Sequence, residues 1–245
     1  MTDEVGITEG SDPSIETKNW QRWVFEFGRP AILISKDPLQ MFKHLQKHTT
    51  ANIIIHCTIT GLAQTALEPN VPDVDTSIRG FFILAKLFGP ERVVLRIDPI
   101  FPYGKFLAKA IGVHKTVKKE WEKRYPHNKL RVRISFMDMY PHVQERFAKL
   151  GIAIPWGTSF HAPLARRSLV WRHLGQPEVC GEPEMLSTGC VAERDLDILG
   201  IKKRSTAVTG QRKACMCLAV KRELQPRRGQ CAFKCTYCYW RKRHG

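Results

Sequence analysis

The sequence predicts an α/β protein in which parallel strands form a partial or full βα (TIM-like) barrel, followed by a basic, cysteine-rich C-terminal segment. Continuous apolar strands alternate with longer helices, which is typical of a parallel sheet covered by helices. A barrel gathers its active site at the carboxyl ends of its strands, and polar residues recur there: Lys36, Thr60, Asp98, Asp138 and Glu182. A doubly wound sheet is the alternative, but the chain has no G-x-G-x-x-G after its first strand and no G-x4-G-K-S/T loop.

The first half of the chain predicts three strands, each followed by a helix. Residues 1–17 are rich in Asp, Glu, Ser, Thr and Gly, so we expect them to be disordered. Apolar runs and helical spacing then place strands at 30–35, 52–60 and 92–98, and helices from Asp37, at 77–88 and at 105–124. Gly89 ends the second helix and Pro99 closes the third strand.

The second half continues the same alternation more weakly. It predicts strands at 130–137, at 152–154 and around 179–180, with helices that end at Gly151 and lie near 164–174. The periodicity fades after Lys202. We therefore expect a barrel over residues 18–200 and a separate basic, cysteine-rich segment over 201–245 that completes it.

Positive charge is concentrated at the C-terminal end of the chain. The formal net charge is +16, and residues 201–245 carry 13 Lys and Arg against one acidic residue, Glu223. Such asymmetry indicates a polyanionic partner, most simply a nucleic acid, and DNA is favoured over RNA. No stretch approaches the ~18 apolar residues of a membrane span, and the acidic N-terminus lacks a signal-peptide core. The sequence thus predicts a cytoplasmic protein, in the host cytoplasm if phage-encoded, with no membrane partner; it leaves the oligomeric state open.

Five of the eight cysteines fall within residues 215–238, which favours a metal site over a disulfide scaffold. Cys231, Cys235 and Cys238 have the spacing C-x3-C-x2-C. Three thiolates can hold three irons of a 4Fe-4S cluster and leave the fourth iron open. Zinc is the alternative, because Cys215 and Cys217 supply further thiolates and a structural zinc needs only four.

The motif formed by Cys231, Cys235, Tyr237 and Cys238 resembles the signature of the radical SAM superfamily, C-x3-C-x-aromatic-C. The resemblance implies a 4Fe-4S cluster whose open iron binds S-adenosyl-L-methionine, and an electron donor that reduces the cluster. It also implies a partial or full βα barrel. The chemistry it implies is cleavage of the cofactor to a 5'-deoxyadenosyl radical that abstracts hydrogen from the substrate.

Residues 30–240 also resemble an uncharacterised bacterial and phage family, a radical-SAM-like domain of unknown function with a C-terminal cysteine cluster. The resemblance is carried by Ile34–Pro38, Glu68–Pro72, Arg96–Ile100, Ser135–Tyr140 and the run from Gly210 through Cys215-Met216-Cys217 to Tyr239. The Y-C-Y ending is similar to that of the spore photoproduct lyase group, which acts on thymine in DNA.

The remaining candidate residues lie at predicted strand ends. We expect catalytic roles for Asp98, Asp138 and Tyr140, and cofactor-binding roles for Arg96, Gly181, Glu182 and Tyr237. Arg96 and Asp98 alternate in phase, so both face the same side of their strand, where a structural ion pair is the competing interpretation. His56, Lys36, Cys180 and Cys190 are weaker candidates, and Cys57 is most simply a buried apolar residue.

The sequence thus favours a radical SAM enzyme that modifies or rearranges a nucleic-acid base. The most specific form of this hypothesis is a thymine-derived base in DNA, as in phage DNA hypermodification. Basic runs interleaved with aromatic residues suit phosphate contacts and base stacking; these runs are Lys202–Arg204, Lys221–Arg222, Arg227–Arg228 and Arg241–Arg243. The alternatives are a zinc-containing nucleic-acid-binding protein without catalysis and a radical SAM enzyme acting on a small metabolite.

Overall fold

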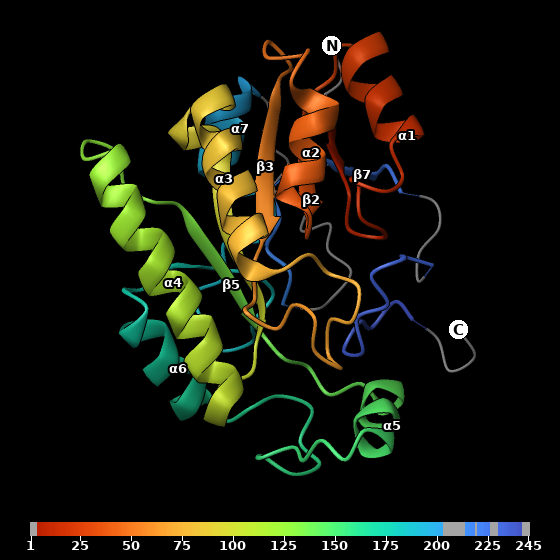
Figure 1. Ribbon diagram of the computed structural model, residues 1–245, viewed down its shortest axis with the longest axis vertical. Helices are drawn as coiled ribbons and strands as arrows, with labels where there is room; N and C mark the ends of the chain where they lie inside the picture. The colour runs from red at the N-terminus through yellow and green to blue at the C-terminus, as the bar shows by residue number, and fades with distance from the viewer. Residues whose placement is uncertain (1–3, 203–213, 219, 226–229, 242–245) are drawn as a thin grey trace.

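A curled, parallel sheet that forms a half-barrel organises the molecule (Figure 1). The computed structural model describes residues 4–202, 214–218, 220–225 and 230–241. Within them the sheet has seven strands in the order β6-β5-β4-β3-β2-β1-β7, and every neighbouring pair is parallel. The strands are β1 Glu4–Ile7, β2 Ala31–Ser35, β3 Ile53–Thr58, β4 Val93–Ile100, β5 Val132–Phe136, β6 Glu178–Val179 and β7 Val220–Glu223.

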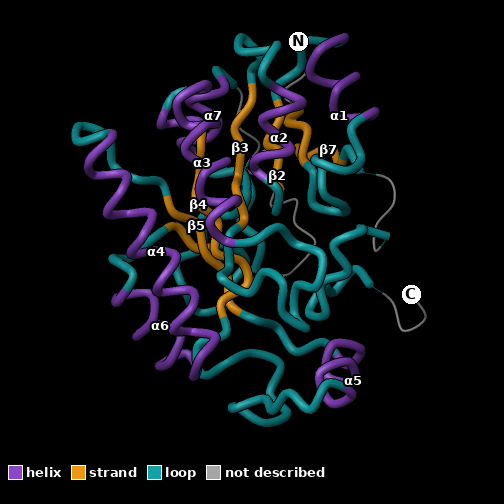
Figure 2. Tube along the Cα trace, in the orientation of Figure 1, coloured by secondary structure: helices purple, strands orange, loops and turns teal. Residues whose placement is uncertain are grey.

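Sequential strand order explains the curl. Right-handed crossovers between neighbouring strands place the connecting helices on one face, so the sheet wraps away from them. Figures 1 and 2 show α2, α3, α4 and α6 on that outer face. The helices are α1 Lys18–Gln21, α2 Pro38–Leu45, α3 Val74–Phe88, α4 Gly104–Arg124, α5 Pro141–Lys149, α6 Leu164–His173 and α7 Glu193–Leu199, with a π-helical turn at Arg22–Glu26 and a 3-10 turn at Pro90–Arg92. The predicted partial barrel is confirmed.

Local sequence signals set the helix ends. The Asp37 side chain accepts a hydrogen bond from the Gln40 amide at 2.9 Å and so caps α2. Asp73 caps α3 in the same way, through the Thr76 amide at 2.8 Å. Gly89, with a φ of 93°, ends that helix as predicted.

Alternation along the strands builds a separate core on each face of the sheet. Leu33, Ile55 and Leu95 point outward and pack against the covering helices. Their neighbours Ile54 and Val94 point inward and pack in a second cluster that includes α7 residues. The half-barrel therefore has a filled interior at the amino ends of its strands, which leaves the carboxyl ends for a site.

A buried ion network also fills this interior. Arg131 and Arg133 on and beside β5 both pair with Asp195 of α7, and Nη2 of Arg133 lies 3.0 Å from Oδ2 of Asp195. Arg133 also pairs with Glu178 of β6. Arg131, Arg133 and Asp195 are at most 3% exposed. Their contacts hold α7 against the inner face of the sheet.

The predicted disorder of residues 1–17 was wrong for the part that the structure describes. Glu4–Ile7 forms β1 between β2 and β7, and Val5 and Ile7 are buried. The acidic, glycine-containing composition hid a short strand that pairs with β2 on one side and with β7, more than 200 residues away, on the other.

Two further element predictions need correction. Residues 152–154 form no strand, because Ile152 instead donates its amide to the Phe147 carbonyl and closes the end of α5. β4 does not stop before Pro99 but continues to Ile100, with an irregularity in its pairing to β5 between Ile97 and Ile100. No helix in the described residues is long and apolar enough to cross a membrane.

Candidate active site

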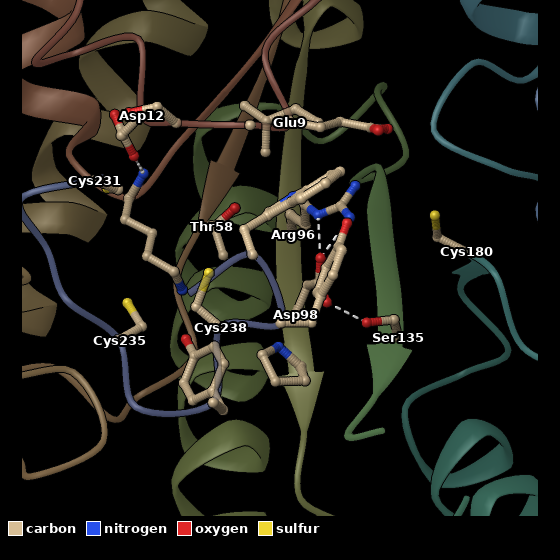
Figure 3. Close-up of a pocket in the computed structure, with 18 of the residues that line it drawn as sticks. Glu9, Asp12, Thr58, Arg96, Asp98, Ser135, Cys180, Cys231, Cys235 and Cys238 are labelled. Atoms are coloured by element: carbon tan, nitrogen blue, oxygen red, sulfur yellow. Dashed lines mark hydrogen bonds and ion pairs between the residues drawn. The ribbon is translucent and has the colours of Figure 1, made fainter. Parts of the chain in front are cut away.

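A cavity of about 210 Å³ opens at the carboxyl ends of the strands (Figure 3). Residues that follow or end β1 through β6 supply most of its wall, as a barrel active site requires. Among these residues are Thr8, Ser35, Thr58, Arg96, Asp98, Ser135, Asp138 and Gly181. Cys190, Cys215 and Lys221 line another part of the cavity, and the C-terminal segment supplies the rest through residues 231, 233–235 and 237–241.

Arg96 and Asp98 lie on the same side of β4, as their alternation predicts, and they form an ion pair. Nε of Arg96 donates to Oδ2 of Asp98 at 2.7 Å, and the Ser135 hydroxyl donates to the other carboxylate oxygen. Burial alone would lower the pKa of Arg96, but Asp98 and the sulfurs of Cys190 and Cys180 raise it well above its usual value. The guanidinium therefore stays charged at the cavity wall and holds the Asp98 carboxylate in place.

Asp138 and Tyr140 line the same cavity and have partners that the sequence analysis missed. Nδ1 of His161 lies 2.8 Å from Oδ1 of Asp138, which is 5% exposed. The Tyr140 ring stacks on Tyr239 at 5.6 Å and meets the edge of Phe160 at 4.8 Å. His161 and Phe160 lie on a loop without regular structure, and no sequence pattern marks them.

A buried carboxylate, Glu68, connects the barrel to the cysteine segment. It lies 2.8 Å from Nζ of Lys36 and accepts a hydrogen bond from the Thr60 hydroxyl at 2.8 Å. The Tyr237 hydroxyl also donates to it. Burial, and then the Glu68 charge, raise the pKa of Tyr237 well above its usual value, so this phenol stays protonated as a donor. Tyr237 thus presents its ring to the cavity while its hydroxyl is used by Glu68.

The N-terminal segment closes another part of the wall. Asp12 is 6% exposed and accepts hydrogen bonds from the Ser35 hydroxyl at 2.8 Å and from the Lys36 amide at 2.6 Å. Burial raises the pKa of Asp12, although these hydrogen bonds oppose the rise. Burial, and then the charge of the nearby Asp12, raise the pKa of the Cys231 thiol. Asp12, within the stretch predicted to be disordered, therefore helps to position the cysteine segment.

The cavity is lined by all three cysteines of the motif, Cys231, Cys235 and Cys238. This position is the one expected for a C-terminal segment that completes the barrel. The loop after β3 holds this segment through Thr236, whose amide donates to the Leu67 carbonyl at 2.9 Å. Helix α5 holds its end through Arg146, which donates to the Cys238 carbonyl at 2.6 Å. Figure 3 shows the three cysteines on one side of the cavity and Cys180 on the opposite side.

The donor set of these three cysteines fits a metal centre. None of them forms a disulfide. Burial raises the pKa of the Cys231 thiol and raises that of Cys235 to about 12, so a bound cation is needed to keep them as thiolates. In the described part of the chain no three His, Cys, Asp or Glu side chains already surround one point at ligand distances. The thiols therefore share a cavity wall and would have to turn inward to share a ligand.

The two predicted residues at this edge, Gly181 and Glu182, lie in different surroundings. Gly181 lines the cavity, but its amide donates to the Ser187 hydroxyl at 2.9 Å. Glu182 lies outside the described cavity lining: its side chain accepts from the Phe136 amide at 2.6 Å and pairs with Arg167 at 3.2 Å. Glu182 thus holds the loop after β6 in place.

His56 is a buried structural histidine. Its Nε2 lies 3.3 Å from Nη1 of Arg133, within the ion network below the cavity. Burial and then Arg133 hold the pKa of His56 well below its usual value, so the ring is neutral. It is absent from the described cavity wall.

The basic segments are only partly described. Lys221 and Arg222 pair with Glu9 at 3.1 Å and Glu4 at 3.8 Å, so the acidic N-terminus takes up part of their charge. Arg241 lines the cavity beside Tyr239 and Trp240, whose rings lie 4.8 Å apart. The other predicted basic runs fall wholly or largely outside the described residues; these are 203–204, 227–228 and 242–243.

Comparison with known proteins adds one finding to this geometry. A family profile described as a domain of unknown function (DUF1848) matches residues 26–240. The chain belongs to this family. The match runs from before β2 to just beyond the last cysteine of the segment and leaves out β1. No curated protein and no solved structure matches the chain.

Proposed function

We propose that this protein is a radical SAM enzyme. The observation that carries the proposal is the position of Cys231, Cys235 and Cys238, which line one cavity with the strand-end residues Arg96 and Asp98. A C-x3-C-x2-C segment packed as a detached zinc finger would not need that position. Bound there, a 4Fe-4S cluster with S-adenosyl-L-methionine supplies a 5'-deoxyadenosyl radical when an external donor provides one electron.

The chain's own residues position the reactants and exclude water. Charged Arg96, held by Asp98, offers a donor for a carboxylate or phosphate at the cavity wall. Phe136, Met137 and Phe233 are at most 6% exposed and make part of that wall apolar, which protects a radical from solvent. We propose that Asp138, which lines the cavity and pairs with His161, also contacts the substrate.

We propose a nucleic-acid base as the substrate, and a thymine-derived base in DNA as its sharpest version. The cavity rim carries Tyr140, Tyr239 and Trp240, with Arg241 next to them. Stacked rings beside a cation suit an unstacked base and its phosphate. A base inside a duplex would have to be flipped out to reach the cavity.

The test is anaerobic reconstitution with iron, sulfide and a reductant, followed by measurement of 5'-deoxyadenosine with and without single-stranded and duplex DNA. We expect the wild type and Cys57→Ala to form it and Cys235→Ala to form none. Cys57 is the matched control because it is buried in β3 away from the cavity. Formation without any response to DNA would refute the substrate proposal, and no formation at all by the iron-loaded wild type would refute the enzyme proposal.

A small metabolite is the second candidate substrate. It is favoured by the pairing of Lys221 with Glu9 and of Arg222 with Glu4, which reduces the charge available to a polyanion. Salt-dependent DNA binding separates the two, because a protein that contacts phosphates loses affinity steeply as salt rises. Catalytically competent protein that does not bind DNA at low salt would favour the metabolite.

A further inference from the structure

Four other cysteines meet inside the half-barrel. Cys180 follows β6, Cys190 precedes α7, and Cys215 and Cys217 precede β7. The sulfurs of Cys180 and Cys190 are 3.0 Å apart, and those of Cys215 and Cys217 are 3.3 Å apart. The two pairs adjoin, because the Cys190 amide donates to Sγ of Cys217 at 3.1 Å. Three segments distant in sequence thus bring four thiols to one place.

The close approach of these segments is built into the backbone. Gly189 has a φ of 74°, and a Cβ at this position would lie 2.7 Å from the Cys217 amide nitrogen. Only glycine fits there without a shift. All four cysteines are at most 7% exposed and belong to the apolar cluster on the inner face of the sheet.

Cationic and amide donors approach the sulfurs of these thiols. Nη1 of Arg96 lies 3.4 Å from Sγ of Cys190 as a donor, and the Cys190 amide donates to Cys217. Lys221, whose side chain is 8% exposed, lies near enough to Cys217 to interact with its charge. Amide and cationic donors to sulfur are the outer contacts that thiolate metal sites use.

We propose that Cys180, Cys190, Cys215 and Cys217 form a second metal centre, ligated by four thiolates and separate from the three-cysteine segment. Tetrahedral zinc with bonds of about 2.3 Å requires sulfurs roughly 3.8 Å apart, so each sulfur pair must open by less than about 1 Å. In the structure the four sulfurs contact one another in two pairs and do not surround a common point at ligand distances. Binding a divalent ion releases one proton from each thiol.

Four protein thiolates fill every position of the metal site, in contrast to the open site of the three-cysteine segment. Such a closed centre binds no substrate. It ties the loop after β6, the start of α7 and the approach to β7 into one unit at the cavity wall, which Cys180, Cys190 and Cys215 line. Zinc and a four-cysteine iron-sulfur cluster share this ligand chemistry, and an iron-sulfur cluster there would also carry electrons.

The decisive experiment measures metal in a variant without the C-terminal ligands. Cys231→Ser, Cys235→Ser and Cys238→Ser are combined, the protein is purified anaerobically, and zinc, iron and acid-labile sulfide are counted per chain. We expect about one zinc, or about four irons with matching sulfide, to remain. Adding Cys217→Ala should remove that metal, whereas adding Cys57→Ala should not.

The outcomes separate this inference from the proposed function. A triple variant that holds no metal, with the four cysteines free or paired in disulfides by mass spectrometry, would overturn the second centre. If the variant with Cys217→Ala does not fold, the metal content of the triple variant still decides. A triple variant with the same metal content as the wild type would support the second centre and refute the cluster on the C-terminal segment.

Discussion

Glu68→Gln should loosen the cysteine segment from the barrel. The carboxylate is 1% exposed and lies between Lys36 of the barrel and Tyr237 of the segment. Burial alone would lower the pKa of Lys36, but Glu68 raises it above its usual value. The ion pair therefore stabilises the fold fully below the unfolded lysine pKa of about 10.4, and this contribution is lost as the pH rises through the higher folded value.

The structure sets the size of the effect. Glutamine keeps the shape of the side chain but leaves the Lys36 ammonium, whose side chain is 15% exposed, without its counter-charge. Removing one partner of a buried pair costs about 3–5 kcal/mol. Because Lys36 keeps some contact with solvent, we expect the lower end, about 3 kcal/mol. With a slope of about 2 kcal/mol per molar urea, the midpoint falls by about 1.5 M.

The assay is urea unfolding at pH 7 with a chelator present, paired with iron retention after anaerobic reconstitution. Glu122→Gln is the matched control, since Glu122 is 64% exposed and lies 3.9 Å from Lys118. It should change the unfolding free energy by less than about 0.5 kcal/mol. A loss below about 1 kcal/mol for Glu68→Gln, with iron retained as in the wild type, would refute the role given to Glu68.

Three further changes probe the interior, the docking of the segment and the cavity. Burial would raise the pKa of Asp195, but Arg133 and Arg131 hold it below its usual value. The contribution of Asp195 to folding stability is therefore present above about pH 4 and lost as the pH falls. Asp195→Asn should cost about 3–5 kcal/mol at neutral pH and flatten the acid unfolding curve measured by circular dichroism. Arg146→Gln removes the donor to the Cys238 carbonyl, so iron retention should fall at least about twofold, while Arg124→Gln on the exposed face of α4 should not change it. Asp98→Asn should slow 5'-deoxyadenosine formation at least about tenfold, a barrier increase of about 1.4 kcal/mol, and an unchanged rate would remove Asp98 from the mechanism.

The sequence predicted those parts of the fold that strong local patterns specify. The runs Ala31–Ser35 and Ile53–Thr58 are mostly apolar and form strands in the middle of the sheet. β1 and β7 have only four residues each and pair with strands far away in the sequence, so no local pattern could reveal them. The apolar triplet 152–154 was too short to compete with the end of α5.

The candidate site was predictable where its residues share one strand or one motif. Arg96 and Asp98 are two residues apart on β4, so alternation placed them together. Glu68 and Lys36 are far apart in sequence, and their pairing depends on how the loop after β3 returns across the strand ends. His161 reaches Asp138 in the same manner, from an irregular loop. Such contacts follow from tertiary folding, and the sequence alone carries no spacing that marks them.

Electron paramagnetic resonance of the reduced, reconstituted protein, recorded with and without S-adenosyl-L-methionine, tests the central claim most directly. The account predicts the signal of a reduced 4Fe-4S cluster that changes when the cofactor is added, because an open iron at the cavity binds it. Cys238→Ala should lose this response while keeping any signal from the second centre. A wild-type cluster signal that the cofactor leaves unchanged, or a protein that binds zinc alone, would contradict the account.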